Sequence, residues 1–218
     1  MADWAGHVER EIERYRDGER RLPDAPHSDA RQRQLTRMGN AAGGAGLSLL
    51  MDGRLAEASE WLHRAAESYR ESMAEAPPGS WGRPIGAMKA LVIAGDWAGA
   101  EAAARWALEL GAAEAETPIG RYAGSLALLV LGRDADARPI AGSLREREDF
   151  PPAVADALAT LAASDLPGYI LAVGSILESF ETRDEYLEDI PVADTVLVLQ
   201  SLATRRELVA ELSSPLLP

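Results

Sequence analysis

The sequence predicts an all-α protein, built as a stack of helical hairpins with an N-terminal helix and C-terminal capping helices. Apolar residues make up 47% of the 218 residues and aromatic residues only 6%. Alanine is abundant, which favours helices, whereas sheets use more β-branched and aromatic side chains. Four apolar stretches each run into a small or polar turn and then a second helical stretch. The length is sufficient to bury a core, and we expect one domain over 1–218.

The N-terminal helix is expected within residues 1–26. Over residues 3–20, bulky apolar side chains recur at helical spacing, namely Trp4, Val8, Ile12 and Tyr15. The stretch "LPDAPHSD" then interrupts the chain, and Ser28 or Asp29 can cap the next helix. Residues 27–182 are predicted to hold the hairpins.

Four turns mark the centres of these hairpins. Their turn residues are separated by 42, 37 and 32 positions and are Gly53, Gly95, Gly132 and Ser164. A helix most easily ends on a residue in the left-handed region, where glycine is favoured. Close after three of the turns stand carboxylates that can cap the following helix, namely Asp96, Asp134 and Asp165.

Small residues after each turn predict close helix crossings. Five positions beyond the turn residues stand Ala58, Ala100, Ala137 and Tyr169. The stretch "GNAAGGAG" lies inside a predicted helix, where each glycine costs about 1 kcal/mol relative to alanine. We therefore expect its glycines to lie at a helix crossing, namely Gly43, Gly44 and Gly46. The stretch lacks the preceding strand, the lysine and the hydroxyl residue of a phosphate loop.

The stretch "GDWAGAEAAARWALEL" resembles the middle of a tetratricopeptide repeat, whose second helix follows a Gly-Asp-aromatic turn and carries two small residues seven apart. The matching small pairs are Ala58 with Ala65 and Ala100 with Ala107. The resemblance covers about residues 30–150 and implies a right-handed stack of hairpins. The family's early tryptophan and leucine are missing, and the spacing departs from 34 residues. A non-repeating helical bundle with glycine turns is the alternative.

The segment 183–218 is predicted to cap the array, because terminal repeats need a polar outer face. Pro191 is expected near the start of its helix. Within it, "EYLEDIPVADTVLVLQSLA" is similar to the C-terminal part of some α-helical immunity proteins of bacterial toxin systems. That likeness implies a protein that blocks a toxin. We expect its acidic run to form a solvated face and helix caps rather than a cation site; the run comprises Asp184, Glu185, Glu188, Asp189 and Asp194.

Composition excludes or disfavours several functions. The absence of cysteine excludes disulfides, zinc-thiolate sites and cysteine nucleophiles. His7, His27 and His63 form no helical ligand pair, and no Gly-x-Ser-x-Gly elbow is present. We therefore expect neither metal nor cofactor, and no enzyme. A net charge of −13, with Lys89 the only lysine, argues against nucleic-acid binding. No run approaches the ~20 apolar residues of a membrane span, so a soluble cytoplasmic protein is expected.

The charges separate between the two helices of each hairpin. The first helices, within residues 31–51, 81–94 and 118–131, carry cations and no carboxylate, whereas the second helices have an acidic excess. In tetratricopeptide-like stacks the first helices line the concave surface, which would then be basic. A groove of one sign concentrates ligands of the other sign.

We therefore predict a noncatalytic protein that binds an acidic peptide or protein partner through this groove. The candidate lining residues are Arg37, Asn40, Trp81, Arg83, Lys89, Arg121 and Tyr122. Arginine holds carboxylates by two-point contacts, and tryptophan and tyrosine add contact area. The alternatives are an immunity-type inhibitor of a bacterial toxin, and a helical enzyme or small-molecule receptor that uses the same groove. Buried first helices could also exclude charge without any binding role.

Overall fold

A computed structural model of the chain describes residues 3–24 and 28–218, so His27 lies outside the described residues. The all-α prediction is confirmed: the described residues form α-helices, short 3-10 helices and connecting turns, and no strand. The α-helices are α1 (Trp4–Arg21), α2 (Ser28–Met51), α3 (Leu55–Met73), α4 (Gly82–Ile93), α5 (Trp97–Glu109), α6 (Pro118–Val130), α7 (Asp134–Leu144), α8 (Pro152–Ala163), α9 (Leu166–Glu181) and α10 (Asp194–Thr204). The 3-10 helices are η1 (Leu22–Asp24), η2 (Ala112–Glu114) and η3 (Leu187–Asp189).

The chain divides into two compact units, each completed by a distant part of the sequence. The first unit contains the described residues up to Asp96, together with Asp184–Val192 and Leu217–Pro218. The second contains Trp97–Arg183 and Ala193–Leu216. The expected capping segment 183–218 therefore contributes to both units. Among the described helices, none has the combined length and apolar character that a membrane crossing requires.

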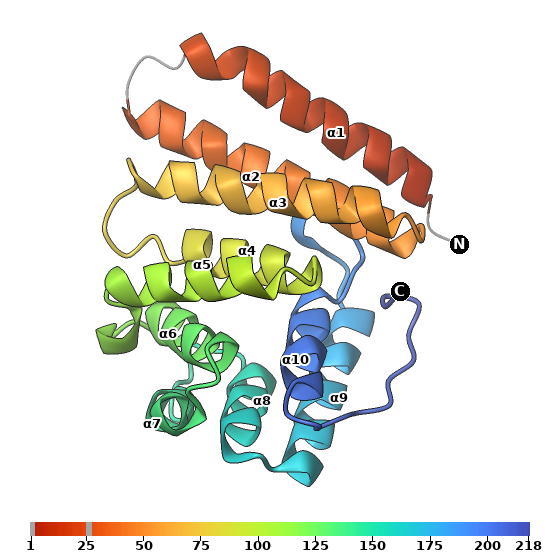
Figure 1. Cartoon of the computed structure of the whole chain (residues 1–218). Helices are drawn as coiled ribbons and strands as arrows, with labels where there is room; N and C mark the ends of the chain where they lie inside the picture. Colours follow the sequence, from red (N-terminus) through yellow and green to blue (C-terminus); the bar gives the residue numbers. More distant parts are fainter. Residues whose placement is uncertain (1–2, 25–27) are drawn as a thin grey trace. The chain divides into compact units, whose positions relative to one another are not determined.

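In the first unit each helix packs against the next along the chain, α1 on α2, α2 on α3 and α3 on α4 (Figure 1). The predicted N-terminal helix is confirmed, and Asp3 caps it by accepting a hydrogen bond from the Gly6 backbone N–H at 2.9 Å. Val8 and Tyr15 are buried on the face that meets α2 and α3. In the second unit the same sequential packing links α5 to α9, and α10 packs on α8 and α9.

The four predicted turns share one backbone geometry. All four turn residues have positive φ: 76°, 74°, 68° and 56° for Gly53, Gly95, Gly132 and Ser164. In each turn, the turn residue's N–H donates to the carbonyl three positions back, and the next N–H donates to the carbonyl five positions before it. This pair of bonds satisfies helix-end carbonyls that would otherwise lack partners. The prediction that these residues end helices in the left-handed region is confirmed.

The predicted caps after the turns fare differently. Asp165 accepts a hydrogen bond from the Gly168 N–H at 3.1 Å and caps α9 as expected. For Asp134 the prediction is wrong, because Arg133 is the N-cap of α7 and Asp134 is its first residue. Its carboxylate instead receives hydrogen bonds from Arg206, which also donates to the Leu129 carbonyl at 2.7 Å. Arg206, which follows α10, thereby links its segment to the turn between α6 and α7 by hydrogen bonds.

The alanines predicted at helix crossings are buried, and so is the larger residue at the fourth such position, Tyr169. Ala58, Ala100, Ala137 and Tyr169 are each at most 1% exposed. Added Cβ atoms would meet Glu11 Cγ at 3.1 Å from Gly44, and Leu62 Cγ at 2.7 Å from Gly46. At Gly43 the nearest atom would be 3.9 Å away, an ordinary contact, so the expectation fails there. Gly44 and Gly46 therefore allow side chains of α1 and α3 to lie close to the α2 backbone.

Pro191 does not begin a helix, which corrects the sequence expectation. The last helix, α10, begins at Asp194, three residues later. Ile190 and Val192 are buried in the non-helical stretch before it. The N–H of Ala193, just before α10, donates to the Leu216 carbonyl at 3.0 Å. This backbone group is therefore paired with the C-terminal segment and not with a helical carbonyl.

The shared turn geometry predicts opposite effects of two substitutions. Gly132→Ala should lower the free energy of unfolding by about 1–2 kcal/mol, because an L side chain is strained at positive φ. Ser164→Gly relieves the same strain, and the gain should be below about 1 kcal/mol because glycine also frees the unfolded chain. Chemical denaturation of both variants measures these changes. A loss of stability in Ser164→Gly equal to that in Gly132→Ala would contradict the turn argument.

Candidate functional site

Five of the seven predicted groove residues lie in the first unit, on α2 and around the start of α4. Arg37 is exposed, and its side chain makes no hydrogen bond or ion pair with any described residue. Asn40, one turn further along α2, accepts a hydrogen bond from the Tyr69 hydroxyl at 2.8 Å. Trp81 precedes α4 and is only 9% exposed, so its ring belongs mainly to the core. Lys89 is half-buried on α4.

Arg83 is engaged inside the first unit. Its Nε donates to the Ser72 hydroxyl at 2.8 Å, and its Nη2 donates to the Gln32 side-chain oxygen. Burial lowers the pKa of Arg83 below its ordinary value. Arg121 and Tyr122 lie on α6 in the second unit, where the Tyr122 ring packs against Phe150 at 5.7 Å between centroids. That these residues bind a ligand remains a prediction.

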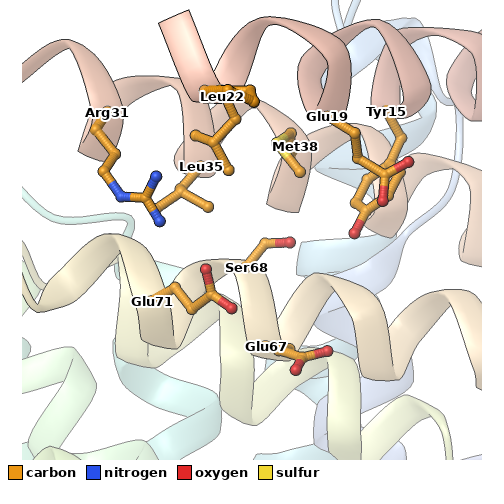
Figure 2. Close-up of a pocket in the computed structure, with 10 residues that line it drawn as sticks. Tyr15, Glu19, Leu22, Arg31, Leu35, Met38, Glu67, Ser68 and Glu71 are labelled. Atoms are coloured by element: carbon orange, nitrogen blue, oxygen red, sulfur yellow. The ribbon is translucent and has the colours of Figure 1, made fainter. Parts of the chain in front are cut away.

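A pocket of about 570 Å³ lies among α1, η1, α2 and α3 (Figure 2). Its buried lining residues are Tyr15, Leu35, Met38 and Ser68. Glu19 comes from α1 and two further glutamates from α3, all with exposed side chains. Arg31 is the one basic residue in the described lining. The pocket therefore combines an apolar floor with an acidic rim.

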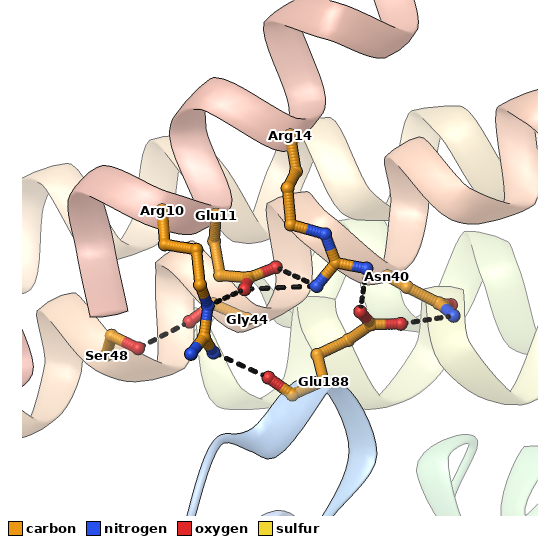
Figure 3. A network of polar contacts seen from close by, with 7 residues as sticks. All are labelled: Arg10, Glu11, Arg14, Asn40, Gly44, Ser48 and Glu188. Carbon is orange, nitrogen blue, oxygen red and sulfur yellow. Dashed lines mark hydrogen bonds and ion pairs between the residues drawn. The ribbon is translucent and has the colours of Figure 1, made fainter. Parts of the chain in front are cut away.

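A buried carboxylate organises a second polar cluster, formed by α1, α2 and the segment 184–192 (Figure 3). The Glu11 side chain is 0% exposed and shares the inward face of α1 with Val8 and Tyr15. Arg10 Nε donates to Glu11 Oε1 at 2.8 Å, and Arg14 Nη1 donates to both carboxylate oxygens at 3.1 and 3.0 Å. A buried charge requires such partners. Glu11 thereby fixes both guanidinium groups.

The same two arginines hold Glu188, which comes from the distant segment. Arg14 Nη2 forms an ion pair with the Glu188 carboxylate, and Asn40 donates to its other oxygen at 3.1 Å. Arg10 donates to the Glu188 backbone carbonyl at 2.7 Å (Figure 3). Burial lowers the pKa of Arg14, but the Glu11 and Glu188 carboxylates outweigh this effect and hold its pKa above the ordinary value. The site is therefore built to receive a carboxylate.

The segment that supplies Glu188 has an unusual backbone. Both Glu188 and Asp189 have φ of 55°, in the left-handed region that side chains other than glycine rarely adopt. Such conformations cost about 1–3 kcal/mol each and persist when surrounding contacts fix them. The contacts at Glu188 are therefore strong enough to hold a strained loop.

The expectation that the acidic run is a solvated face is wrong for Glu188, whose side chain is only 15% exposed. Asp184, Glu185 and Asp189 are exposed as predicted. The side chain of Glu188 is mostly buried because it pairs with cations on α1, about 175 positions earlier in the chain, and the sequence around Glu188 does not indicate these partners.

Sequence reasoning missed Arg10, Arg14 and Tyr69 as site residues. One available signal was Glu11, an acidic residue on the buried stripe of α1, since a buried carboxylate demands nearby cations. For Tyr69 the signal lay in two glycines, because Cβ atoms at Gly39 and Gly86 would both lie within 3 Å of its ring. The ring passes between α2 and α4, and its hydroxyl reaches Asn40.

Neither a protein-family model, nor a curated protein, nor a solved structure matches this chain. Over residues 3–24 and 28–218, no group of three histidine or acidic side chains is placed to hold a metal ion.

A histidine in the first unit gives a pH prediction. Nδ1 of His63 lies 2.7 Å from the Ser59 carbonyl and Nε2 lies 3.0 Å from Asp96 Oδ2, so the protonated ring donates to both. The Ser59 carbonyl raises the pKa of His63 above 6.5, burial opposes this, and Asp96 adds to the rise. The contacts of the protonated ring stabilise the fold fully below pH 6.5, the ordinary pKa of histidine. This contribution is lost as the pH rises through the higher pKa of His63 in the folded state.

We therefore expect the free energy of unfolding to fall between about pH 6 and 8, by less than about 1 kcal/mol because the ring is half exposed. His63→Gln should remove this dependence, whereas His7→Gln should keep it. Urea denaturation across this pH range provides the measurement. An identical slope in wild type and His63→Gln would refute the assignment.

Proposed function

We propose that this chain is a noncatalytic, tetratricopeptide-like binding protein that engages an acidic segment of a peptide or protein partner. The proposal is supported by the hydrogen bonds and the ion pair that Arg10, Arg14 and Asn40 form with Glu188. Charge-assisted hydrogen bonds of this kind are about twice as strong as neutral ones. The predicted basic residues of α2 and α4 would thus act together with those of α1.

The contacts fit a peptide better than an isolated anion. Arg10 binds the main-chain carbonyl of the acidic residue, while Arg14 and Asn40 bind its side-chain carboxylate. A free carboxylate or phosphate would leave the carbonyl contact unused. Recognition of backbone and side chain together is a property of peptide binding.

The receiving groups are preorganised. Glu11 fixes Arg10 and Arg14 from the buried side, and Tyr69 fixes the Asn40 amide by donating to its oxygen. Side chains already held in place lose little further freedom on binding, which favours affinity. Arg37 is one turn from Asn40 on α2 and would extend the cationic surface along the helix.

In this proposal the segment 184–192 is an internal ligand, and a partner's acidic segment replaces it. An intramolecular competitor lowers the apparent affinity by the fraction of molecules in which the site is open. The strained φ angles of Glu188 and Asp189 favour replacement, because the released loop can relax.

The test uses the full chain and a fluorescein-labelled peptide copy of residues 184–191, DEYLEDIP. Glu188→Ala removes the carboxylate of the internal competitor and so weakens it, and this variant should bind the peptide about tenfold more tightly than the wild type, as measured by fluorescence anisotropy. Adding Arg14→Gln to this variant should weaken binding about tenfold, the effect of one charge-assisted contact.

Arg16→Gln is the matched control, because Arg16 is exposed on the same helix and the charge change is equal. If Arg14→Gln and Arg16→Gln lower the affinity for the peptide equally, the effect depends only on the overall charge. That result would contradict the proposal. Equal binding by wild type and Glu188→Ala would show that the segment does not compete.

The two alternatives predict different outcomes in the same assay. An immunity-type inhibitor would bind a basic toxin and leave the acidic peptide unbound. A small-molecule receptor or enzyme would bind neither peptide, and native mass spectrometry of the protein purified from its host would detect the compound instead.

A further inference from the structure

We infer that the pocket among α1, α2 and α3 docks a basic segment of a second protein, by receiving an arginine or lysine side chain between its acidic rim and apolar floor. This surface is separate from the Glu188 site and takes the opposite charge. The inference does not depend on the function proposed above.

The floor suits the methylene stem of such a side chain. Leu35 and Met38 of α2 are 3% and 5% exposed, and Leu22 of η1 borders them as a half-buried residue (Figure 2). Arginine and lysine carry apolar stems that lie along apolar surface while the charged head stays near polar groups. A fully polar ion would make no use of this floor.

The rim carries a net negative charge. The side chains of Glu19, Glu67 and Glu71 form no hydrogen bond or ion pair with any residue in the described part of the chain. Glu67 and Glu71 are four positions apart on α3, a like-charge spacing that mildly destabilises a helix. Arg31, the lining cation, is drawn to Glu75 at 3.4 Å. An incoming cation would therefore find carboxylates on both sides.

Tyr15 lines the pocket together with Glu19 of α1 and Glu67 of α3 (Figure 2). Burial raises the pKa of the Tyr15 hydroxyl, Ser68 opposes this by hydrogen bonding, and the charges of Glu19 and Glu67 raise the pKa further. Arg64, which stacks over Trp61 at 4.8 Å, acts in the opposite direction. Carboxylates from α1 and α3 thus act on one point above the floor.

The exposed rim favours a protein segment over a single small amine. Pockets for organic ligands span about 300–1,000 Å³, and this one, at about 570 Å³, lies within that range, so its volume alone does not distinguish the two. Its rim consists of exposed residues on two helices, so a segment crossing it can place a cation and an apolar neighbour together. Aromatic and arginine residues commonly carry such contacts.

The experiment measures binding of a fluorescein-labelled decapeptide of alternating arginine and leucine to the full chain. With a net charge of −13 the protein attracts any basic peptide, so the comparison must hold the total charge constant. Glu19→Gln/Glu67→Gln removes two rim charges. Glu9→Gln/Glu60→Gln removes two exposed charges from the same two helices outside the pocket.

The rim variant should bind about tenfold more weakly than the wild type, the combined effect of two exposed charge pairs, and its salt dependence should be shallower. The control variant should stay within about twofold. Leu22→Ser should also weaken binding, because it removes part of the apolar floor. Circular dichroism verifies that each variant is folded.

Equal weakening by the two double variants, or no binding of the peptide by the wild type, would overturn the inference. A second probe, acetyl-arginine methylamide, distinguishes a small-molecule site. If this compound alone saturates the rim with an affinity equal to that of the decapeptide, the pocket binds small cations and docking of a protein segment is refuted.

Discussion

Close approach of neighbouring helices at small side chains is the constraint on which both units depend. Where α2 carries Gly44, the carboxylate stem of Glu11 fits against its backbone, and where it carries Gly46, Leu62 of α3 does so. Protein interiors are packed as densely as organic crystals, so a single added methyl group is felt at such contacts. The same small residues that bring the helices together thus make room for the buried polar groups of the candidate site.

This packing explains how two surfaces of opposite charge coexist on the first three helices. Successive residues of α1 point to different sides: Arg10 and Arg14 toward the Glu188 segment, and Tyr15 and Glu19 toward the pocket. Glu11 lies buried between these groups, and among the described residues its ion-pair partners are the two arginines. The cationic residues therefore serve the fold as well as any ligand, whereas the pocket glutamates have no described structural partner.

Local signals made most of the fold predictable from sequence. Glycine and serine turns, alanines at fixed offsets and the apolar stripe of α1 depend on neighbours within a few residues, and the structure confirms them. The contacts of Asp134 with Arg206, and of Glu188 with Arg10, join positions more than 70 apart, and no local pattern reveals them. A local pattern can also be ambiguous. An aromatic residue at a helix start, such as Trp81, is consistent with either a groove or a core.

The division of the first unit into three stretches of sequence bears on its synthesis. On the ribosome, α1 to α4 emerge before the whole of Trp97–Arg183, and Asp184–Val192 follows only afterwards. At ~5–20 residues per second, the 148 positions that separate Asn40 from Glu188 take roughly 7 to 30 seconds to synthesise. During that interval Glu11, on the same helix, is the carboxylate available to both arginines. The Glu188 contacts can therefore form only after Trp97–Arg183 has been synthesised.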